Sequence, residues 1–144
     1  MTYQLAEAPQ PAQKKLAPRG TILIVDDDRS MAEVLADRLA RQRFRVVAAA
    51  DGAAGLAAAR REQPDLVLLD LCLPDCDGLV ICQELADSTE TCQIPVIILS
   101  GLDGEDLIRR CRAAGGRYFL RKPYDPNTLL LLIRDALADG WNEL

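Results

Sequence analysis

Residues 66–70 read Leu-Val-Leu-Leu-Asp, an uninterrupted apolar run that ends in a carboxylate. A short apolar run without polar alternation is typical of a strand buried on both faces of a sheet. Residues 21–25 (TILIV) repeat this pattern and are followed by Asp26, Asp27 and Asp28. These two runs predict a parallel sheet covered by helices, with acidic side chains where its strands end.

The alternation of strand and helix continues on both sides of these runs. Three further strands are predicted at 44–49, 95–99 and 118–120. Helices are predicted after each strand: from near 30, over 53–61, from 78 to about 86, over 105–114 and over 127–138. Five successive strand–helix units with right-handed crossovers predict an α/β fold, a doubly wound five-stranded parallel sheet in a three-layer sandwich.

The start of the first helix carries two signals. Ser30 and Glu33 have the spacing of a capping box, which predicts that Ser30 caps the helix. An apolar stripe at Met31, Val34, Leu35 and Leu39 is expected to face the core. Asp28 is interpreted instead as an acid of the preceding turn that caps the helix, because helix N-termini favour acidic residues.

One domain accounts for most of the chain. Residues 1–19 contain three prolines and no sustained period, so we expect a flexible N-terminal tail. The domain is predicted over 20–140, and 141–144 form the C-terminal end. No apolar run approaches the roughly 20 residues of a membrane span, and no secretory signal is evident. We therefore expect a cytoplasmic protein without a membrane partner.

Charge and composition exclude several functions. The net charge is −5, and because residues 1–19 carry +2, the remainder carries −7, which argues against direct nucleic acid binding. The chain has no histidine, which excludes Ser-His-Asp and Cys-His catalysis. The five cysteines are irregularly spaced, so we expect reduced thiols rather than a zinc site: Cys72, Cys76, Cys82, Cys92 and Cys111.

Polar side chains follow the predicted strands at their carboxyl ends, where ligands bind in such sheets. Asp26 and Asp27 end the first strand and Asp70 the third, while Ser100 and Lys122 end the fourth and fifth. With the strand order 2-1-3-4-5, these four strands are neighbours. Lys122 is the single lysine of residues 20–144, beside 13 arginines, which indicates a need for a compact point charge.

Three clustered carboxylates repel one another unless a cation joins them. Magnesium prefers oxygen ligands and commonly binds one or two carboxylates with phosphate oxygens. A carboxylate can also act as a nucleophile toward phosphorus, while a metal, an ammonium and a hydroxyl stabilise the charge that develops. The set therefore predicts phosphoryl transfer. These residues include none of the groups that hydride transfer or acyl transfer would need.

Four stretches of the chain resemble the receiver domain of bacterial two-component response regulators: 21–27 (TILIVDD), 70–78 (DLCLPDCDG), 95–101 (PVIILSG) and 119–124 (FLRKPY). The resemblance covers roughly 20–140 and implies a flavodoxin-like fold with Asp70 as phosphoacceptor. It implies magnesium, or manganese as its substitute, bound directly by Asp27 and Asp70, through water by Asp26, and by the backbone carbonyl of Cys72. Lys122 would pair with the phosphoryl oxygens.

The same resemblance implies a switch and its partners. Ser100 would bond to the phosphoryl group, Phe119 would change rotamer, and the surface of the fourth helix, fifth strand and fifth helix would change. The Lys122–Pro123 bond would be cis. The phosphoryl donor would be a sensor histidine kinase or a phosphotransfer protein, and the receiver of the signal a downstream protein or output domain. The resemblance is also compatible with a homodimer that forms on phosphorylation. The chain would not be an enzyme beyond its own phosphorylation and dephosphorylation.

Cys72 and Leu102 stand two residues after Asp70 and Ser100, at positions that modulate hydrolysis in this family. Neither side chain is suited to orienting water, so we expect a long-lived phosphorylated state.

Three other functions stay open on the sequence. A pseudo-receiver would bind partners without phosphorylation, which the complete set of Asp27, Asp70 and Lys122 argues against. An aspartyl phosphatase would want an acid two residues after its nucleophile, where this chain has Cys72. A flavin module would want a phosphate-binding loop after the first strand, where three aspartates stand.

Overall fold

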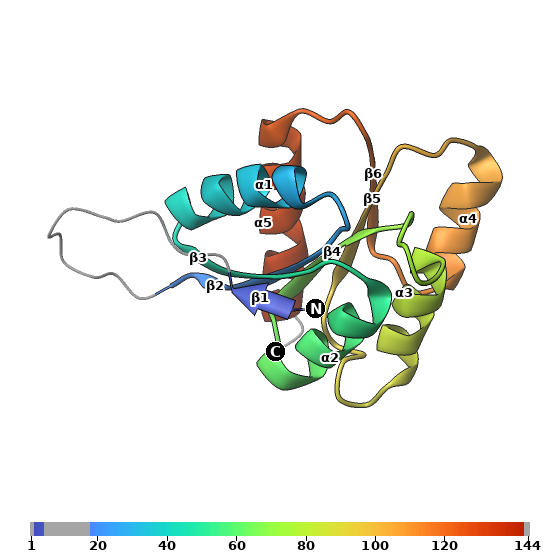
Figure 1. Cartoon of the computed structure of the whole chain (residues 1–144), viewed down its shortest axis with the longest axis horizontal. Helices are drawn as coiled ribbons and strands as arrows, with labels where there is room; N and C mark the ends of the chain where they lie inside the picture. Colours follow the sequence, from blue (N-terminus) through green and yellow to red (C-terminus); the bar gives the residue numbers. More distant parts are fainter. Residues whose placement is uncertain (1, 5–17, 143–144) are drawn as a thin grey trace, which may run out of the picture.

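A computed structural model of the chain describes residues 2–4 and 18–142, and gives only the backbone of Gln4 and of residues 139–142. Six strands form one sheet: β1 (Thr2–Gln4), β2 (Gly20–Val25), β3 (Phe44–Ala49), β4 (Leu66–Asp70), β5 (Val96–Ser100) and β6 (Tyr118–Arg121). The described helices are α1 (Arg29–Arg41), α2 (Gly52–Glu62), α3 (Gly78–Asp87), α4 (Glu105–Ala113) and α5 (Pro126–Asn142). Figure 1 shows α1 and α5 on one side of this sheet, and α2, α3 and α4 around the other.

The order of the sheet is β1-β3-β2-β4-β5-β6, and all pairs from β3 to β6 are parallel. This confirms the predicted doubly wound parallel sheet and its 2-1-3-4-5 order. Strands β4 and β5 are buried at every residue, which explains the uninterrupted apolar runs that precede Asp70 and Ser100. Because β2, β4, β5 and β6 run parallel as neighbours, their carboxyl ends lie at the same edge of the sheet.

β1 adds a strand that the sequence did not predict. It pairs antiparallel with β3, with Thr2 opposite Ala49 and Gln4 opposite Val47. These residues were expected to belong to a flexible tail over 1–19, of which residues 5–17 lie outside the described part of the chain. A three-residue strand offers too short a pattern for a periodicity argument.

Two apolar layers hold the helices on the sheet. One, between the sheet and α2, α3 and α4, includes Leu69, Ala58, Ile81 and Cys111. The other, between the sheet and α1 and α5, includes Leu39 and Ile133 with other large side chains. Because β4 sends alternate residues into each layer, both faces of the sheet are apolar.

The start of α1 decides between the two caps that the sequence suggested. Asp28, and not Ser30, is the N-cap, and its side chain accepts a hydrogen bond from the amide of Met31. The helix therefore begins at Arg29, and its buried face is Ala32, Leu35, Ala36 and Leu39. Met31 and Val34, expected in the core, are 49% and 59% exposed.

Two close approaches bring helices against the strands that carry the acidic residues. A Cβ on Gly55 of α2 would lie 2.9 Å from the side chain of Val25. A Cβ on Gly78, the first residue of α3, would lie 2.5 Å from the carbonyl oxygen of Asp70. Only glycine leaves room for these contacts, so α3 starts directly against the end of β4.

Within the described residues, no helix is both long enough and apolar enough to cross a lipid bilayer.

Candidate functional site

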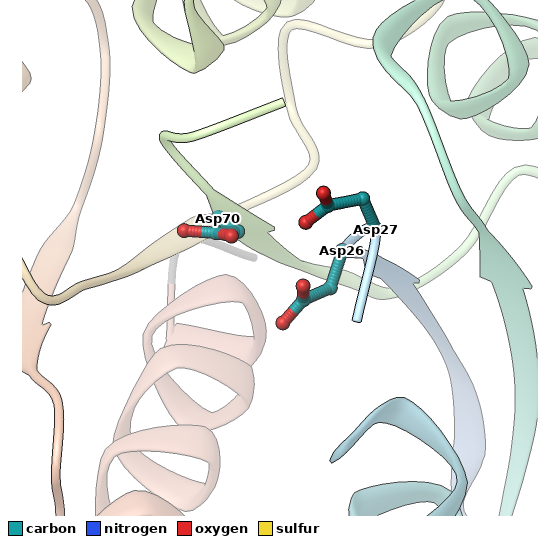
Figure 2. A group of neighbouring side chains, drawn as sticks. All are labelled: Asp26, Asp27 and Asp70. Carbon is teal, nitrogen blue, oxygen red and sulfur yellow. The ribbon is translucent and has the colours of Figure 1, made fainter. Parts of the chain in front are cut away.

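Three aspartates gather where β2 and β4 end. Asp70 is the last residue of β4, and Asp26 and Asp27 follow the last residue of β2. One carboxylate oxygen from each lies within 4.8 Å of the other two. Figure 2 shows the side chains of Asp26 and Asp27 on the turn after β2, beside the strand end that carries Asp70. The prediction that these three side chains converge is confirmed.

The turn that carries Asp26 and Asp27 is held by backbone bonds. The amide of Asp26 donates to the carbonyl oxygen of Ala49 at 3.0 Å, which ties the turn to the end of β3. The amide of Asp28 donates to Oδ1 of Asp26 at 2.9 Å, which leaves Oδ2 of that carboxylate for other contacts. The acidic side chains thus stand on a fixed turn rather than on a loose loop.

Lys122 enters the cluster from the end of β6. Its Nζ lies 3.1 Å from Oδ2 of Asp26 and 3.9 Å from Oδ2 of Asp70. Its amide donates to the carbonyl oxygen of Ser100 at 2.8 Å, so the backbone before it is fixed on β5. The Lys122–Pro123 peptide bond is cis, as the resemblance implied. The lone lysine of the domain therefore meets two of the three carboxylates.

Burial and charge act in opposite directions here. The pKa of the Asp70 carboxyl is raised, chiefly because burial disfavours its charged form; Lys122 lowers it, and Asp26 and Asp27 raise it again. For Lys122, burial acts to lower the pKa, but the carboxylates of Asp26 and Asp70 outweigh it and the pKa is raised. The ammonium of Lys122 therefore does not bring the pKa of Asp70 back to its ordinary value.

The donor set fits a hard dication. All three candidate ligands are carboxylates, with oxygen atoms close enough to share one ion. Asp26 and Asp70 are buried whereas Asp27 is exposed, so the cluster is open on one side. Such a site suits magnesium, which keeps water or phosphate oxygens among its ligands.

Ser100 is the last residue of β5, the strand that pairs with β4. It is fully buried at the end of β5, and its Oγ accepts a hydrogen bond from the amide of Leu102 at 3.0 Å. Phe119 pairs with Ile98, two residues before Ser100, and packs in the layer of α2, α3 and α4. Residues two apart on a strand share a face, so Ser100 and Phe119 lie along one side of the sheet. A hollow of about 270 Å³ adjoins Phe119, between α4 and β6.

The loop after β4 is anchored to Asp70 and to α2. The amide of Cys72 donates to Oδ1 of Asp70 at 3.3 Å, while its side chain is exposed. The carboxylate of Asp75 accepts the amides of Gly52 and Ala53 at 2.8 and 3.0 Å, which joins this loop to the start of α2. This bridge was not evident from the sequence, because Asp75 lies among other polar turn residues and its partners are more than 20 positions away.

Tyr124 is a second residue that the sequence analysis missed. It is half-buried in the layer of α1 and α5, and burial raises the pKa of its hydroxyl, on which the charges of Lys122 and Asp26 also act. Its position two residues after Lys122 was a signal that could have been used.

Comparison with known proteins agrees with this geometry. Residues 22–134 match the family model of the response regulator receiver domain. The response regulator PleD of Caulobacter vibrioides is 36% identical over 113 residues, which cover 78% of this chain and 25% of PleD. The protein PilH of Pseudomonas aeruginosa is 38% identical over 117 residues, which cover 81% of this chain and 97% of PilH. The chain spans half or less of the length of several other curated relatives, among them a probable transcriptional regulator, ycf27, of Porphyridium aerugineum, of which it covers 47%.

Solved structures show the same fold. A CheY-like response regulator receiver domain protein of Methanospirillum hungatei superposes with a TM-score of 0.81 at 27% identity, over 86% of this chain and 98% of that one. The receiver domain of Klebsiella pneumoniae RstA, in its BeF3-activated form, superposes with a TM-score of 0.76 at 31% identity, over 81% and 97%. With its three converging aspartates and the matched motifs, the chain belongs to the family of response regulator receiver domains.

Proposed function

We propose that this chain is a phosphorylation switch in which Asp70 accepts a phosphoryl group in the presence of magnesium. The observation that carries the proposal is the convergence of Asp26, Asp27 and Asp70 within 4.8 Å, with Nζ of Lys122 against two of them. The proposed donor is a phosphohistidine of a sensor kinase or of a phosphotransfer protein. The family membership supports this class of donor.

In the proposed transfer, an Oδ atom of Asp70 forms a bond to phosphorus while the bond between phosphorus and the donor nitrogen breaks. Because Asp70 is buried beside like charges, its carboxylate gains from a cation at the acidic cluster. Asp27 and Asp70 would bind magnesium directly, and Asp26 through water. When bound, the ion neutralises charge on the phosphoryl oxygens. The ammonium of Lys122 stabilises the same charge from the other side of the cluster.

The proposed readout is an exchange of partners at Ser100. Its Oγ now accepts the amide of Leu102, and a phosphoryl group on Asp70 brings about two negative charges and new acceptor oxygens. Ser100 would then donate its hydroxyl hydrogen to the phosphoryl group. Phe119, on the same side of β6, would turn into the space that Ser100 vacates. The surface of α4, β6 and α5 would change with it and be read by a downstream protein or output domain.

The test is the intact mass of the protein after incubation with acetyl phosphate and magnesium. We expect wild type to gain one phosphoryl group, and Asp70→Asn to gain none. Asp75→Asn is the matched control, because Asp75 is an exposed aspartate of the neighbouring loop whose carboxylate is bonded to α2. A wild-type protein that gains no mass would refute the proposal and favour a phosphorylation-independent interaction module.

The lifetime of the phosphorylated state follows from the residues around Asp70. Leu102 is exposed and apolar, and the exposed Cys72 carries a weak hydrogen-bonding thiol, so neither holds a water for attack. We expect slow loss of the phosphoryl group in a time course of intact mass, and faster loss in Leu102→Gln. Equal lifetimes of the two proteins would contradict this role of Leu102.

The proposed place of action is the cytoplasm, on the sequence argument given above. The same proposal includes a homodimer that forms when this chain is phosphorylated.

A further inference from the structure

β1 lies outside the part of the chain that the family model matches, yet it reaches the functional edge. The match covers residues 22–134, whereas β1 consists of Thr2–Gln4. It covers the edge of β3, whose residues Val46–Ala49 are apolar and buried. β1 is therefore the outermost strand on this side of the sheet. Some edge strands do no more than cover the unpaired backbone groups of the neighbouring strand. β1 does more, because two contacts connect it with the turn that carries Asp26 and Asp27.

The first contact runs through the end of β3. Thr2 is paired with Ala49, the last residue of β3. The carbonyl oxygen of the same Ala49 accepts the amide hydrogen of Asp26 at 3.0 Å. A strand fixed beside Ala49 restricts the motion of this carbonyl, and hence the position of the Asp26 backbone.

The second contact lies on the other side of the turn. The guanidinium carbon of Arg29 lies 4.7 Å from the centroid of the Tyr3 ring, within the range of a cation–π interaction. Arg29 is the first residue of α1, directly after Asp28. The Tyr3 ring also packs against the apolar layer of α1 and α5. The turn 26–28 is therefore held at its start through Ala49 and at its end through Arg29.

The ring of Tyr3, and not its hydroxyl, makes these contacts. Its hydroxyl oxygen is buried and finds no hydrogen-bond partner among the described residues. A buried hydroxyl without a partner weakens the docking of the strand that carries it. Nothing in the structure explains why the residue is tyrosine rather than phenylalanine, and this supplies a control: Tyr3→Phe keeps the ring and removes the unsatisfied group.

We propose that β1 is a strap that orients the metal-binding turn, with Tyr3 as a positioning residue for the carboxylates of Asp26 and Asp27. The inference rests on the proposed function, because it assumes that these carboxylates bind magnesium. Without the strap, the turn would sample other positions, and an ion would have to select the productive one. Its apparent affinity would fall in proportion to the population of that arrangement.

The experiment compares full-length wild type, Tyr3→Phe and Tyr3→Ala, none of which changes a metal ligand or a charge. Hydrogen exchange reports on the Asp26 amide, which donates to Ala49. The Lys122 amide, bonded to Ser100 at 2.8 Å on the far side of the cluster, is the internal control. In Tyr3→Ala we expect faster exchange at Asp26 and unchanged exchange at Lys122, which separates a local loss from global destabilisation. Tyr3→Phe should exchange at Asp26 as slowly as wild type, or more slowly.

Calorimetric titration with magnesium chloride gives the second readout. For Tyr3→Ala we expect a magnesium dissociation constant roughly threefold to tenfold higher than that of wild type. Loss of a group bonded directly to a metal ligand typically costs about tenfold or more, and Tyr3 acts less directly. In an Arg29→Gln background, Tyr3→Ala should have a smaller effect, because the ring has lost its partner. Tyr3→Phe should bind magnesium like wild type.

The two proposals fail in different ways. If wild type binds no magnesium, the proposed function is wrong. If wild type binds magnesium and Tyr3→Ala binds it equally well with unchanged exchange at Asp26, the strap is refuted while the proposed function stands. Equal acceleration of exchange at Asp26 and Lys122 would also refute it, because β1 would then serve overall stability only.

Discussion

Asp70, at the end of β4, and Asp75, in the loop that follows, have opposite effects on the stability of the fold when they are charged. The Asp70 carboxyl is buried beside Asp26 and Asp27, and its pKa is raised. The exposed Asp75 carboxylate accepts hydrogen bonds from the amides of Gly52 and Ala53, and these lower its pKa. A raised pKa means that the folded state holds the proton more tightly than the unfolded state, so ionisation at neutral pH weakens the fold. A lowered pKa means that the folded state holds the proton less tightly, so ionisation at neutral pH stabilises the fold.

We therefore predict opposite signs for the same substitution at these two positions. In chelator at pH 7, Asp70→Asn should raise the free energy of unfolding by roughly 0.5–2 kcal/mol, within the usual range for one substitution. Asp75→Asn should lower it. Urea unfolding curves of the three proteins measure both effects. Destabilisation by Asp70→Asn would show that Lys122 outweighs burial and repulsion.

At the scale of the element, the start of α1 tests which residue caps it. Asp28 accepts the amide of Met31, whereas Ser30 lies inside the first turn. Asp28→Ala should lower the free energy of unfolding by about 1 kcal/mol, the typical loss of an N-cap. Ser30→Ala should be close to neutral. A larger loss for Ser30→Ala, measured by urea unfolding, would restore the capping box that the sequence suggested.

The start of α3 depends on the absence of a side chain. A Cβ at Gly78 would meet the backbone of Asp70 and Leu71 at 2.5 and 2.6 Å, where no flexible side chain can yield. Gly78→Ala should lower the free energy of unfolding by about 1–3 kcal/mol. It should also reduce phosphorylation by acetyl phosphate, because the end of β4 must shift.

Gly101 is the matched control for Gly78. It follows Ser100 at the same edge of the sheet, and a Cβ there would meet nothing within 4 Å. Gly101→Ala should leave both stability and phosphorylation close to wild type. Equal effects of the two substitutions would show that the close approach of α3 is not what positions Asp70.

At the scale of the whole molecule, a buried thiol predicts how stability changes at alkaline pH. Cys82 is buried between the sheet and α3, and burial is the main reason that its pKa is raised to about 11, from an ordinary value of 9.0. Between these pH values the unfolded chain releases this proton while the folded chain keeps it. The unfolded state then binds fewer protons, so stability falls as the pH rises through this window.

Cys82→Ala removes this contribution. From about pH 8 to about pH 10.5, wild type should lose roughly 2 kcal/mol more than Cys82→Ala, as read from urea unfolding at each pH. Other groups that titrate in this range are shared by the two proteins and cancel in the comparison. Parallel losses would show that the thiol ionises without leaving the fold.

Much of the architecture was predictable because its signal is local. Residues 22–25 and 66–69 are apolar throughout, since both faces of their strands are buried there. β1 was not predictable, because three residues carry no period and their partner β3 is more than 40 positions away. The sequence left two candidate caps for α1, because Asp28 and Ser30 both have side-chain acceptors, and the choice between them depends on where β2 ends.

The parallel sheet, and the acidic and basic groups at its functional edge, follow from the amino-acid sequence alone, because burial and side-chain chemistry act residue by residue. Which of these groups meet depends on the packing of the whole chain. This packing brings Lys122 to Asp26 across 96 positions, places Ser100 against the amide of Leu102, and sets the ring of Tyr3 against Arg29. Distances of a few ångströms depend on how the helices pack on the sheet, and the sum of many weak contacts that sets this packing cannot be read from any single stretch of sequence.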